Sequence, residues 1–201
     1  MMKLAIFDFD GTITTRDSFT DFIFFCFGTC RTILGIIILS PHIILYALGL
    51  EPNWKAKSFV LKYFFKGLNK ENLNKYARNY ISQKLPDLIR PMALEKLKWH
   101  QKEGHRIVIV SASFECYLSI WCESLGLDII ATKMEIKNEI LTGKLATKNC
   151  YGEEKILRLK EKHNLADFDY IYAYGDTKGD LPLRTIANEF HYKPFRKPRA
   201  A

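Results

Sequence analysis

The sequence lacks several of the features that assign a chain to a class at sight. Its five cysteines form no Cys-x-x-Cys pair, and such an odd, scattered set in mostly apolar surroundings predicts reduced, buried thiols in a cytosolic protein. No secretory signal peptide is expected, because acidic residues interrupt the first apolar run and no small-residue cleavage site follows it. No internal repeat or low-complexity segment is visible, and the ordinary composition excludes a disordered chain. The cysteines are Cys26, Cys30, Cys116, Cys122 and Cys150.

Negative charge is also in short supply. Lysine and arginine number 30 against 22 aspartate and glutamate residues, which gives a formal net charge of +8. This balance favours an anionic partner such as a phosphorylated metabolite, nucleic acid or an anionic membrane surface, although an equally good alternative is solvated surface charge. We expect no nucleic-acid binding, because no aromatic-basic motif or recognition-helix pattern accompanies the charge. At 201 residues the chain can bury a sizeable core, as one domain or as one domain with a substantial insertion.

Short apolar strands alternate with helices along the chain. Buried strands are predicted at 3–8, 105–113 and 169–176. Helices are predicted at 91–103, 114–125, 153–163 and 181–187, and the stretches "DIIATKMEI" and "EILTGKLA" are typical of a hairpin. The long block 17–85 is helical in pattern, with breaks expected at Gly28, Pro41, the 49–52 segment and Gly67.

This alternation predicts an α/β fold, a three-layer doubly wound parallel sheet of the Rossmann-like kind. The helical block between the first two strands is far longer than an ordinary crossover. It is therefore expected to be an inserted helical cap over the sheet. The predicted division is a catalytic core of residues 1–14 and 88–201 and a cap of residues 15–87.

Two aspartates stand one residue apart where the first strand ends. Asp8 and Asp10 repel each other, and no basic residue is near them in sequence before Arg16, so a cation is expected between them. Ligands of open parallel sheets bind beyond the carboxyl ends of the strands, and the stretch "GDTKGD" brings Asp176 and Asp180 to another such end. Carboxylate oxygens are what Mg²⁺ prefers, so these acids predict a Mg²⁺-dependent phosphoryl-transfer site.

The remaining parts of such a site are also present. Lys155 near a helix start supplies a point charge for a phosphate or a nucleophile. Ser111, with the backbone N–H groups of Ala112 and Ser113, supplies a cradle for phosphate oxygens. With Asp8 as the nucleophile, Asp10 is left free to protonate the leaving oxygen and to deprotonate the attacking water.

The motifs "DFDGT", the serine of "VSAS", the lysine of "GEEK" and "GDTKGD" resemble the four ordered motifs of the haloacid dehalogenase superfamily of phosphatases. The long helical insertion resembles the phosphoserine-phosphatase-like branch. The resemblance implies an aspartyl-phosphate at Asp8, acid/base work by Asp10 and phosphate binding by Ser111, Ala112 and Lys155. It further implies Mg²⁺ held by Asp8, by Asp10 through its backbone carbonyl and by Asp176, with Asp180 assisting.

Two alternatives compete with a phosphatase. A calcium loop at Asp8 and Asp10 would need an acid or amide where the chain has Thr12 and a glycine where it has Ile13. A non-enzymatic receiver-type phospho-acceptor domain also places acids and a lysine at strand ends. Such domains usually carry an adjacent acid pair and no large insertion. Turnover distinguishes them, because a receiver would be phosphorylated once without releasing phosphate catalytically.

Residues 32–50, "TILGIIILSPHIILYALGL", carry no charge apart from a proton that His42 can take up. As one helix they would extend about 28 Å, nearly a bilayer core. A single span would place Asp8 and Ser111 on opposite sides of a membrane, so the motifs exclude it. The open alternatives are the core of the cap, which is favoured, and a surface that dips into lipid. Lys55, Lys57, Lys62 and the basic tail 191–199 would assist the second.

The substrate stays open between a small phosphorylated metabolite and a lipid phosphate. A phosphatidylglycerophosphate phosphatase branch is similar in its long apolar, proline-containing cap segment. The stretch "TITTRDSF" lacks the acidic pattern that phosphoserine phosphatases carry after their first motif, which argues against phosphoserine itself. The expected location is the cytoplasm, with peripheral membrane contact as the alternative.

Overall fold

The computed structural model describes residues 2–196, and its centre is a five-stranded sheet in which every pair of neighbouring strands is parallel. The spatial order is β3-β2-β1-β6-β7, so the chain winds outward from the central strand β1 in both directions. The strands are β1 (Lys3–Phe7), β2 (Arg106–Phe114), β3 (Asp128–Thr132), β6 (Tyr170–Gly175) and β7 (Glu189–Tyr192).

Helices cover both faces of the sheet because both faces of its strands are apolar. Ala5 and Phe7 of β1 belong to a core with α4 and α5, whereas Leu4 and Ile6 belong to a second core with α6 and the 3₁₀ helix η3. The predicted three-layer doubly wound fold is thereby confirmed. These elements are α4 (Pro91–Lys102), α5 (Glu115–Ser124), α6 (Glu153–Lys162) and η3 (Lys178–Thr185).

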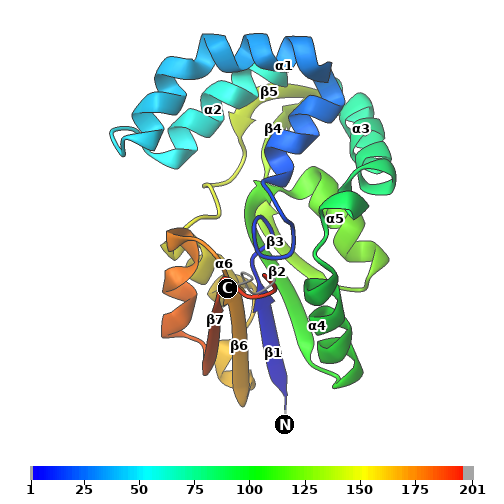
Figure 1. Ribbon diagram of the computed structural model, residues 1–201, viewed down its shortest axis with the longest axis vertical. Helices are drawn as coiled ribbons and strands as arrows, with labels where there is room; N and C mark the ends of the chain where they lie inside the picture. Colours follow the sequence, from blue (N-terminus) through cyan, green and yellow to red (C-terminus); the bar gives the residue numbers. More distant parts are fainter. Residues whose placement is uncertain (1, 197–201) are drawn as a thin grey trace, which may run out of the picture.

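Three helices and a hairpin form a second layer above the carboxyl edge of the sheet (Figure 1). The hairpin joins the cap through backbone hydrogen bonds, since the Gly67 N–H donates to the Leu141 carbonyl and the Leu141 N–H donates to the Leu68 carbonyl, both at 2.9 Å. The cap side of the molecule therefore includes residues beyond the predicted insertion. The elements are α1 (Ser18–Ala47), α2 (Asn53–Phe64), α3 (Lys70–Gln83), β4 (Met134–Lys137) and β5 (Ile140–Leu145); short 3₁₀ turns lie at η1 (Leu85–Leu88) and η2 (Leu165–Asp167).

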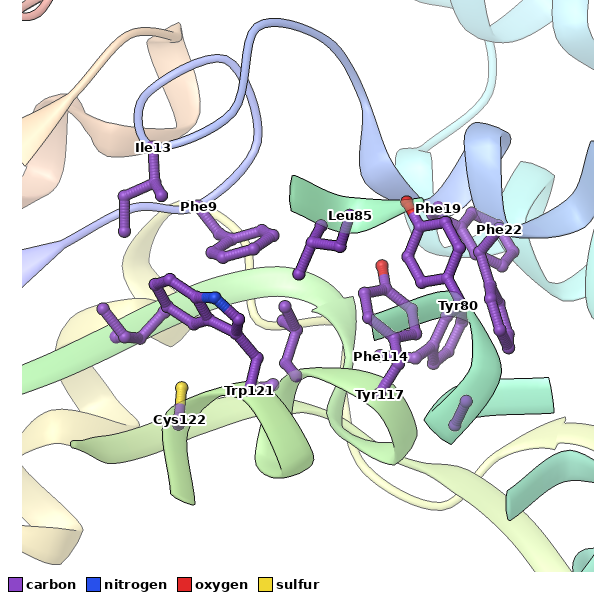
Figure 2. Close-up of a cluster of buried hydrophobic side chains, with 14 of the residues drawn as sticks. Phe9, Ile13, Phe19, Phe22, Tyr80, Leu85, Phe114, Tyr117, Trp121 and Cys122 are labelled. Atoms are coloured by element: carbon purple, nitrogen blue, oxygen red, sulfur yellow. The ribbon is translucent and has the colours of Figure 1, made fainter. Parts of the chain in front are cut away.

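A cluster of buried aromatic side chains fastens the cap to the core (Figure 2). Phe22 of α1 packs against Tyr117 of α5 with ring centroids 4.9 Å apart, and Phe19 packs edge-on against Phe114 at 4.7 Å. Such pairs stabilise beyond their buried area. The start of α1 is thus fixed directly above the strand ends.

The break in α1 lies at a glycine rather than at the proline where one was also expected. Gly28 has φ 73° and ψ 168°, which kinks the helix into two arms, whereas the helix continues through Pro41. Proline lacks the N–H that would bond the carbonyl of Ile37, and the hydroxyl of Ser40 donates to that carbonyl instead at 2.8 Å. The prediction that Pro41 interrupts the helix was wrong for this reason.

The second arm of α1 is not the buried centre of the cap, so the favoured interpretation of residues 32–50 was also wrong. Ile37 and Ile44 are 62% and 56% exposed. Within residues 2–196, α1 is the one helix long and apolar enough to cross a membrane, and 28% of its most apolar window is buried. The cap offers too little protein to cover an arm that is apolar on nearly every side.

The carboxyl-terminal region differs in detail from the prediction. The expected helix at 181–187 is the 3₁₀ helix η3, and the edge strand β7 was not predicted. The sequence "EFHY" has no long apolar run to mark a strand, and pairing with β6 alone organises it. Part of the predicted basic tail, residues 197–199, lies outside the described residues.

Candidate active site

Three of the predicted site residues meet at one edge of the sheet. β1 ends at Phe7, and the N–H of the next residue, Asp8, donates to the carbonyl of Tyr174 in β6 at 2.9 Å. Ser111 in β2 and Asp176 after β6 lie at the same edge, because both strands run parallel to β1 beside it. All three side chains are buried.

Lys155 joins this group from the first turn of α6. Its Nζ lies 2.6 Å from Oδ1 of Asp8 and 2.5 Å from Oδ1 of Asp180, and the three side chains are almost completely buried. One ammonium between two carboxylates leaves a net negative charge where the effective dielectric constant is low. A further cation would be stabilised here.

The pKa values show that the Lys155 ammonium stabilises the charged form of Asp180 more than that of Asp8. Burial raises the pKa of Asp8 to about 8, and Lys155 offsets burial only in part. Burial also raises the pKa of Asp180, but Lys155 and hydrogen bonds from Thr177 outweigh it and hold the value below the ordinary range. Burial lowers the pKa of Lys155, yet the two carboxylates raise it above its usual value, so the amine stays charged. Asp8 is the carboxylate left short of positive charge.

Asp8, Asp176 and Asp180 each present a carboxylate oxygen within 4.8 Å of the others. Asp176 also accepts a hydrogen bond from Thr12 at 3.4 Å and pairs with Arg196 at 2.9 Å. Burial and the nearby Asp180 raise the pKa of Asp176. A buried set of oxygen donors that carries excess negative charge fits Mg²⁺ in ligand type and in charge.

Asp180 is occupied on both oxygens by the chain itself. Oδ2 accepts from the backbone N–H of Asp176 at 3.1 Å, and from the N–H and hydroxyl of Thr177 at 2.9 and 2.8 Å, while Oδ1 pairs with Lys155. Asp180 therefore positions the loop that carries Asp176, and its assisting role in the site stays a prediction.

The glycine of "DFDGT" leaves room for this loop. Gly11 has φ +78°, a left-handed conformation, and a Cβ at this position would overlap the Asp176 carboxylate. Any side chain at position 11 would push apart the acids of the two strand ends.

Asp10 points away from the acid cluster and toward the cap. Oδ1 accepts from the backbone N–H of Ser18, the first residue of α1, at 2.7 Å, and Oδ2 accepts from the hydroxyl of Ser113. Burial and the nearby Asp17 raise the pKa of Asp10 to about 6, against the two serine hydrogen bonds. A carboxyl group with this pKa can both donate and accept a proton near neutrality. Its side chain is not among the clustered carboxylates, so its predicted contact to a metal would rest on the backbone carbonyl.

The predicted phosphate loop breaks the regular register of β2 between Ser111 and Phe114. The Ser111 hydroxyl accepts from the N–H of Ser113 at 3.0 Å, which holds the loop in a tight turn. The carbonyl of Ala112 accepts from Thr132 at 2.9 Å. Both hydrogen bonds lie within the protein and support this turn.

One lysine of the cap reaches this loop, and the sequence did not single it out as a site residue. Lys57 of α2 donates to the Ala112 carbonyl at 2.6 Å and to Asn149 at 3.0 Å. Burial lowers the pKa of Lys57 to about 8, although Asp17 and Asp10 raise it. Nothing in the local sequence distinguishes this lysine from its neighbours on α2. Only the packing of cap on core brings it to the site.

Residues 5–184 match the model of the haloacid dehalogenase-like hydrolases. The chain belongs to this family. The family match covers the strand-end acids, the phosphate loop and the cap.

Three known proteins are similar to this chain. Protein CicA of Caulobacter vibrioides is 33% identical over 195 residues, which covers 96% of this chain and 86% of CicA. A histidinol-phosphatase of Neisseria meningitidis serogroup C is 27% identical over 128 residues, or 60% of this chain and 58% of that protein. A solved phosphoserine phosphatase, a phospho-aspartyl intermediate analogue, shares 19% identity with a TM-score of 0.68, and the match covers 94% of this chain and 85% of that one.

These matches confirm the predicted class. The chain is a haloacid dehalogenase-like hydrolase, and its fold is that of the phosphoserine phosphatases.

Proposed function

We propose that the protein is a Mg²⁺-dependent phosphomonoester phosphatase in which Asp8 forms an aspartyl-phosphate. The main observation behind the proposal is that two neighbouring carboxylates lie in different environments. Asp8 lies against Lys155 in the acid cluster, whereas Asp10 is held apart by Ser113 and Ser18 with a pKa near neutrality. Nucleophilic and acid/base catalysis need this separation of roles.

In the first step an oxygen of Asp8 attacks phosphorus, and the bond from phosphorus to the alcohol oxygen breaks. Protonated Asp10 gives its proton to that oxygen, and the alcohol leaves. In the second step Asp10 takes a proton from a water molecule, which attacks the phosphorus of the acyl phosphate. The bond from phosphorus to Asp8 breaks, and inorganic phosphate is released with both aspartates restored.

The surrounding residues hold the phosphoryl group during both steps. Ser111, the loop N–H groups and Lys155 would face its equatorial oxygens. Mg²⁺ on Asp8, Asp176 and the Asp10 carbonyl would supply a positive charge that screens the anionic phosphate from the anionic nucleophile. Asp180 keeps Asp176 and Lys155 in place.

Phosphate release from p-nitrophenyl phosphate tests this proposal. The purified protein is expected to release phosphate over many turnovers with Mg²⁺, to stop in excess chelator and to recover when Mg²⁺ is restored. Full activity in excess chelator would exclude the metal role. A single phosphorylation without turnover would favour a receiver-type domain.

A second candidate, a lipid-phosphate phosphatase at a membrane surface, is favoured by one observation. The second arm of α1 has apolar side chains, including Leu34, Ile37, Ile38 and Ile44, that stay more than half exposed among residues 2–196. Between Asp21 and Glu51 the chain has no acidic residue, so nothing there repels an anionic bilayer.

A further inference from the structure

An apolar groove of about 260 Å³ runs between α1 and α2 inside the cap. Its walls are residues at helical spacing on the two facing helices, so each helix contributes one continuous stripe. The groove is smaller than the roughly 300–1,000 Å³ of sites for drug-sized ligands, and therefore suits one slender group. The wall residues used below are Ile36, Leu39 and Ile43 of α1, and Ala56, Val60 and Phe64 of α2.

The kink in α1 creates the groove. A straight helix would carry the second arm away from α2, but the turn at Gly28 lays this arm along α2 (Figure 1). Leu39 and Phe64 are buried at the base of the groove, whereas Ile36 and Ile43 on its rim are 40% and 38% exposed. The groove is therefore an open channel with an apolar lining rather than a closed packing defect.

The inner end of the groove lies at the active site. Asp17 and Lys57 line this end, and Lys57 is the residue that donates to the carbonyl of Ala112 in the phosphate loop. Ser113 of the same loop donates to Asp10, the acid that faces the leaving oxygen. A substituent on that oxygen can therefore pass Lys57 and continue into the groove.

We propose that this groove binds the apolar chain of the substrate, and that the substrate is a phosphomonoester of a chain-bearing alcohol. Lys57 lies where the polar link between phosphate and chain would pass, and its ammonium suits the oxygens of such a link. The inference rests on the proposed phosphatase activity and names the substrate class for that site. The chain can come from a dissolved alkyl phosphate or from a lipid phosphate in a bilayer, since both present the same chemistry.

The decisive experiment measures kcat/KM for ethyl, butyl, hexyl and octyl phosphate below their aggregation concentrations. Each methylene that enters the groove is expected to raise kcat/KM about threefold to fourfold until the groove is filled. A flat series, with normal Mg²⁺-dependent hydrolysis of p-nitrophenyl phosphate, would overturn the inference and leave the phosphatase proposal intact. Absence of hydrolysis of every ester would instead contradict the phosphatase proposal.

Two variants of residues on α2 test where the apolar chain of the substrate binds. Ala56→Leu fills the groove. In this variant kcat/KM for octyl phosphate is expected to fall to the value for ethyl phosphate. Ser58→Leu adds similar bulk toward a different pocket of about 810 Å³, lined by Trp54 and Tyr151, and should leave the octyl-to-ethyl ratio of kcat/KM unchanged. If Ser58→Leu lowered the ratio and Ala56→Leu did not, the alkyl chain of the substrate would bind in the other pocket, and the assignment to the groove would be wrong. If Ala56→Leu does not fold, Ile36→Gln at the exposed rim serves instead and should reduce the ratio.

A final experiment distinguishes a dissolved alkyl phosphate from a lipid phosphate as the source of the alkyl chain. The same long-chain phosphate is offered to the wild type below its aggregation concentration and embedded in vesicles of neutral phospholipid. Hydrolysis of both, with the chain-length gain retained in solution, supports the groove. Hydrolysis only in vesicles, with no chain-length gain in solution, would show that the surface rather than the groove selects the substrate.

Discussion

At the edge of the sheet, Lys155 lies in the interior with a carboxylate on either side, whereas in the second arm of α1, Ile37 and Ile44 stand more than half exposed to solvent. The core surrounds its costly buried charges with partners from its own chain. The cap leaves apolar surface that its own chain does not cover. The difference fits our proposal that the core carries out the chemistry, while the cap selects the substrate and any surface that the protein contacts.

The largest effect is expected from removing the nucleophile. Asp8→Asn should lower kcat by a factor on the order of 10³ or more, because the proposed attack on phosphorus needs the Asp8 carboxylate. Phosphate release and thermal unfolding are measured together, with Asp87→Asn on an exposed acid as the matched control. Asp8→Ala excludes recovery by deamidation. Substantial phosphatase activity in Asp8→Ala would contradict the covalent mechanism.

Removing the proton donor should affect substrates unequally. Asp10→Asn is expected to slow esters of poor leaving groups by about 10²–10⁴-fold and p-nitrophenyl phosphate much less. Burial raises the pKa of Asp10 to about 6, so the acid form persists up to that pH and is lost above it. In the wild type the rate for alkyl relative to p-nitrophenyl esters should fall as pH rises through 6. An equal loss for all esters would contradict the acid role.

Breaking the buried ion pairs tests whether the core depends on its own partners. Lys155→Met leaves Asp8 and Asp180 as unpaired buried acids, which should lower the free energy of unfolding by about 3–5 kcal/mol near neutral pH. Protonation of the two acids at lower pH relieves the repulsion, so the loss should shrink there. Denaturant titration at two pH values measures this, and Lys160→Met, exposed on the same helix, should change little. A loss that is equal at both pH values would point to lost packing instead.

The smallest effect on stability is expected in the cap. Replacing Ile37 and Ile44 with aspartate should change the free energy of unfolding by only about 0.5 kcal/mol each, because both side chains are exposed. If this arm contacts lipid, the variant should bind anionic vesicles more weakly and still hydrolyse p-nitrophenyl phosphate. Leu157→Asp with Met92→Asp changes the charge equally at exposed apolar positions outside the cap.

Two results would contradict a lipid-facing arm. A wild type that ignores anionic vesicles would exclude the contact. Unfolding of the Ile37→Asp, Ile44→Asp variant would show that these side chains are covered by protein, such as a second copy of the chain.

The candidate site at the edge of the sheet could be predicted from sequence because its signals are local. Apolar runs mark β1, β2 and β6, and the residues that end them bear the carboxylates and the serine. Lys155 and Asp180 needed the motif order as well, since neither stands out alone. The structure brings all of these side chains to one edge.

The cap could be predicted only in outline because its properties depend on distant contacts. Lys57 reaches the loop at Ala112 across 55 positions of sequence. The Ser40 hydroxyl donates to the carbonyl that Pro41 leaves without a partner, and the pattern of apolar residues does not predict this contact. An apolar run such as residues 32–50 also has the same pattern whether protein, lipid or solvent surrounds it.

Trapping the intermediate tests the assignment of Asp8 most directly. The wild-type enzyme is mixed with p-nitrophenyl phosphate and Mg²⁺, quenched in acid during turnover, and treated with borohydride, which reduces an acyl phosphate to an alcohol. The peptide that spans β1 is then sequenced by mass spectrometry. We expect homoserine in place of aspartate at position 8, and none in Asp8→Asn. Reduction at another acid, or none at any acid during active turnover, would contradict the aspartyl-phosphate mechanism at Asp8.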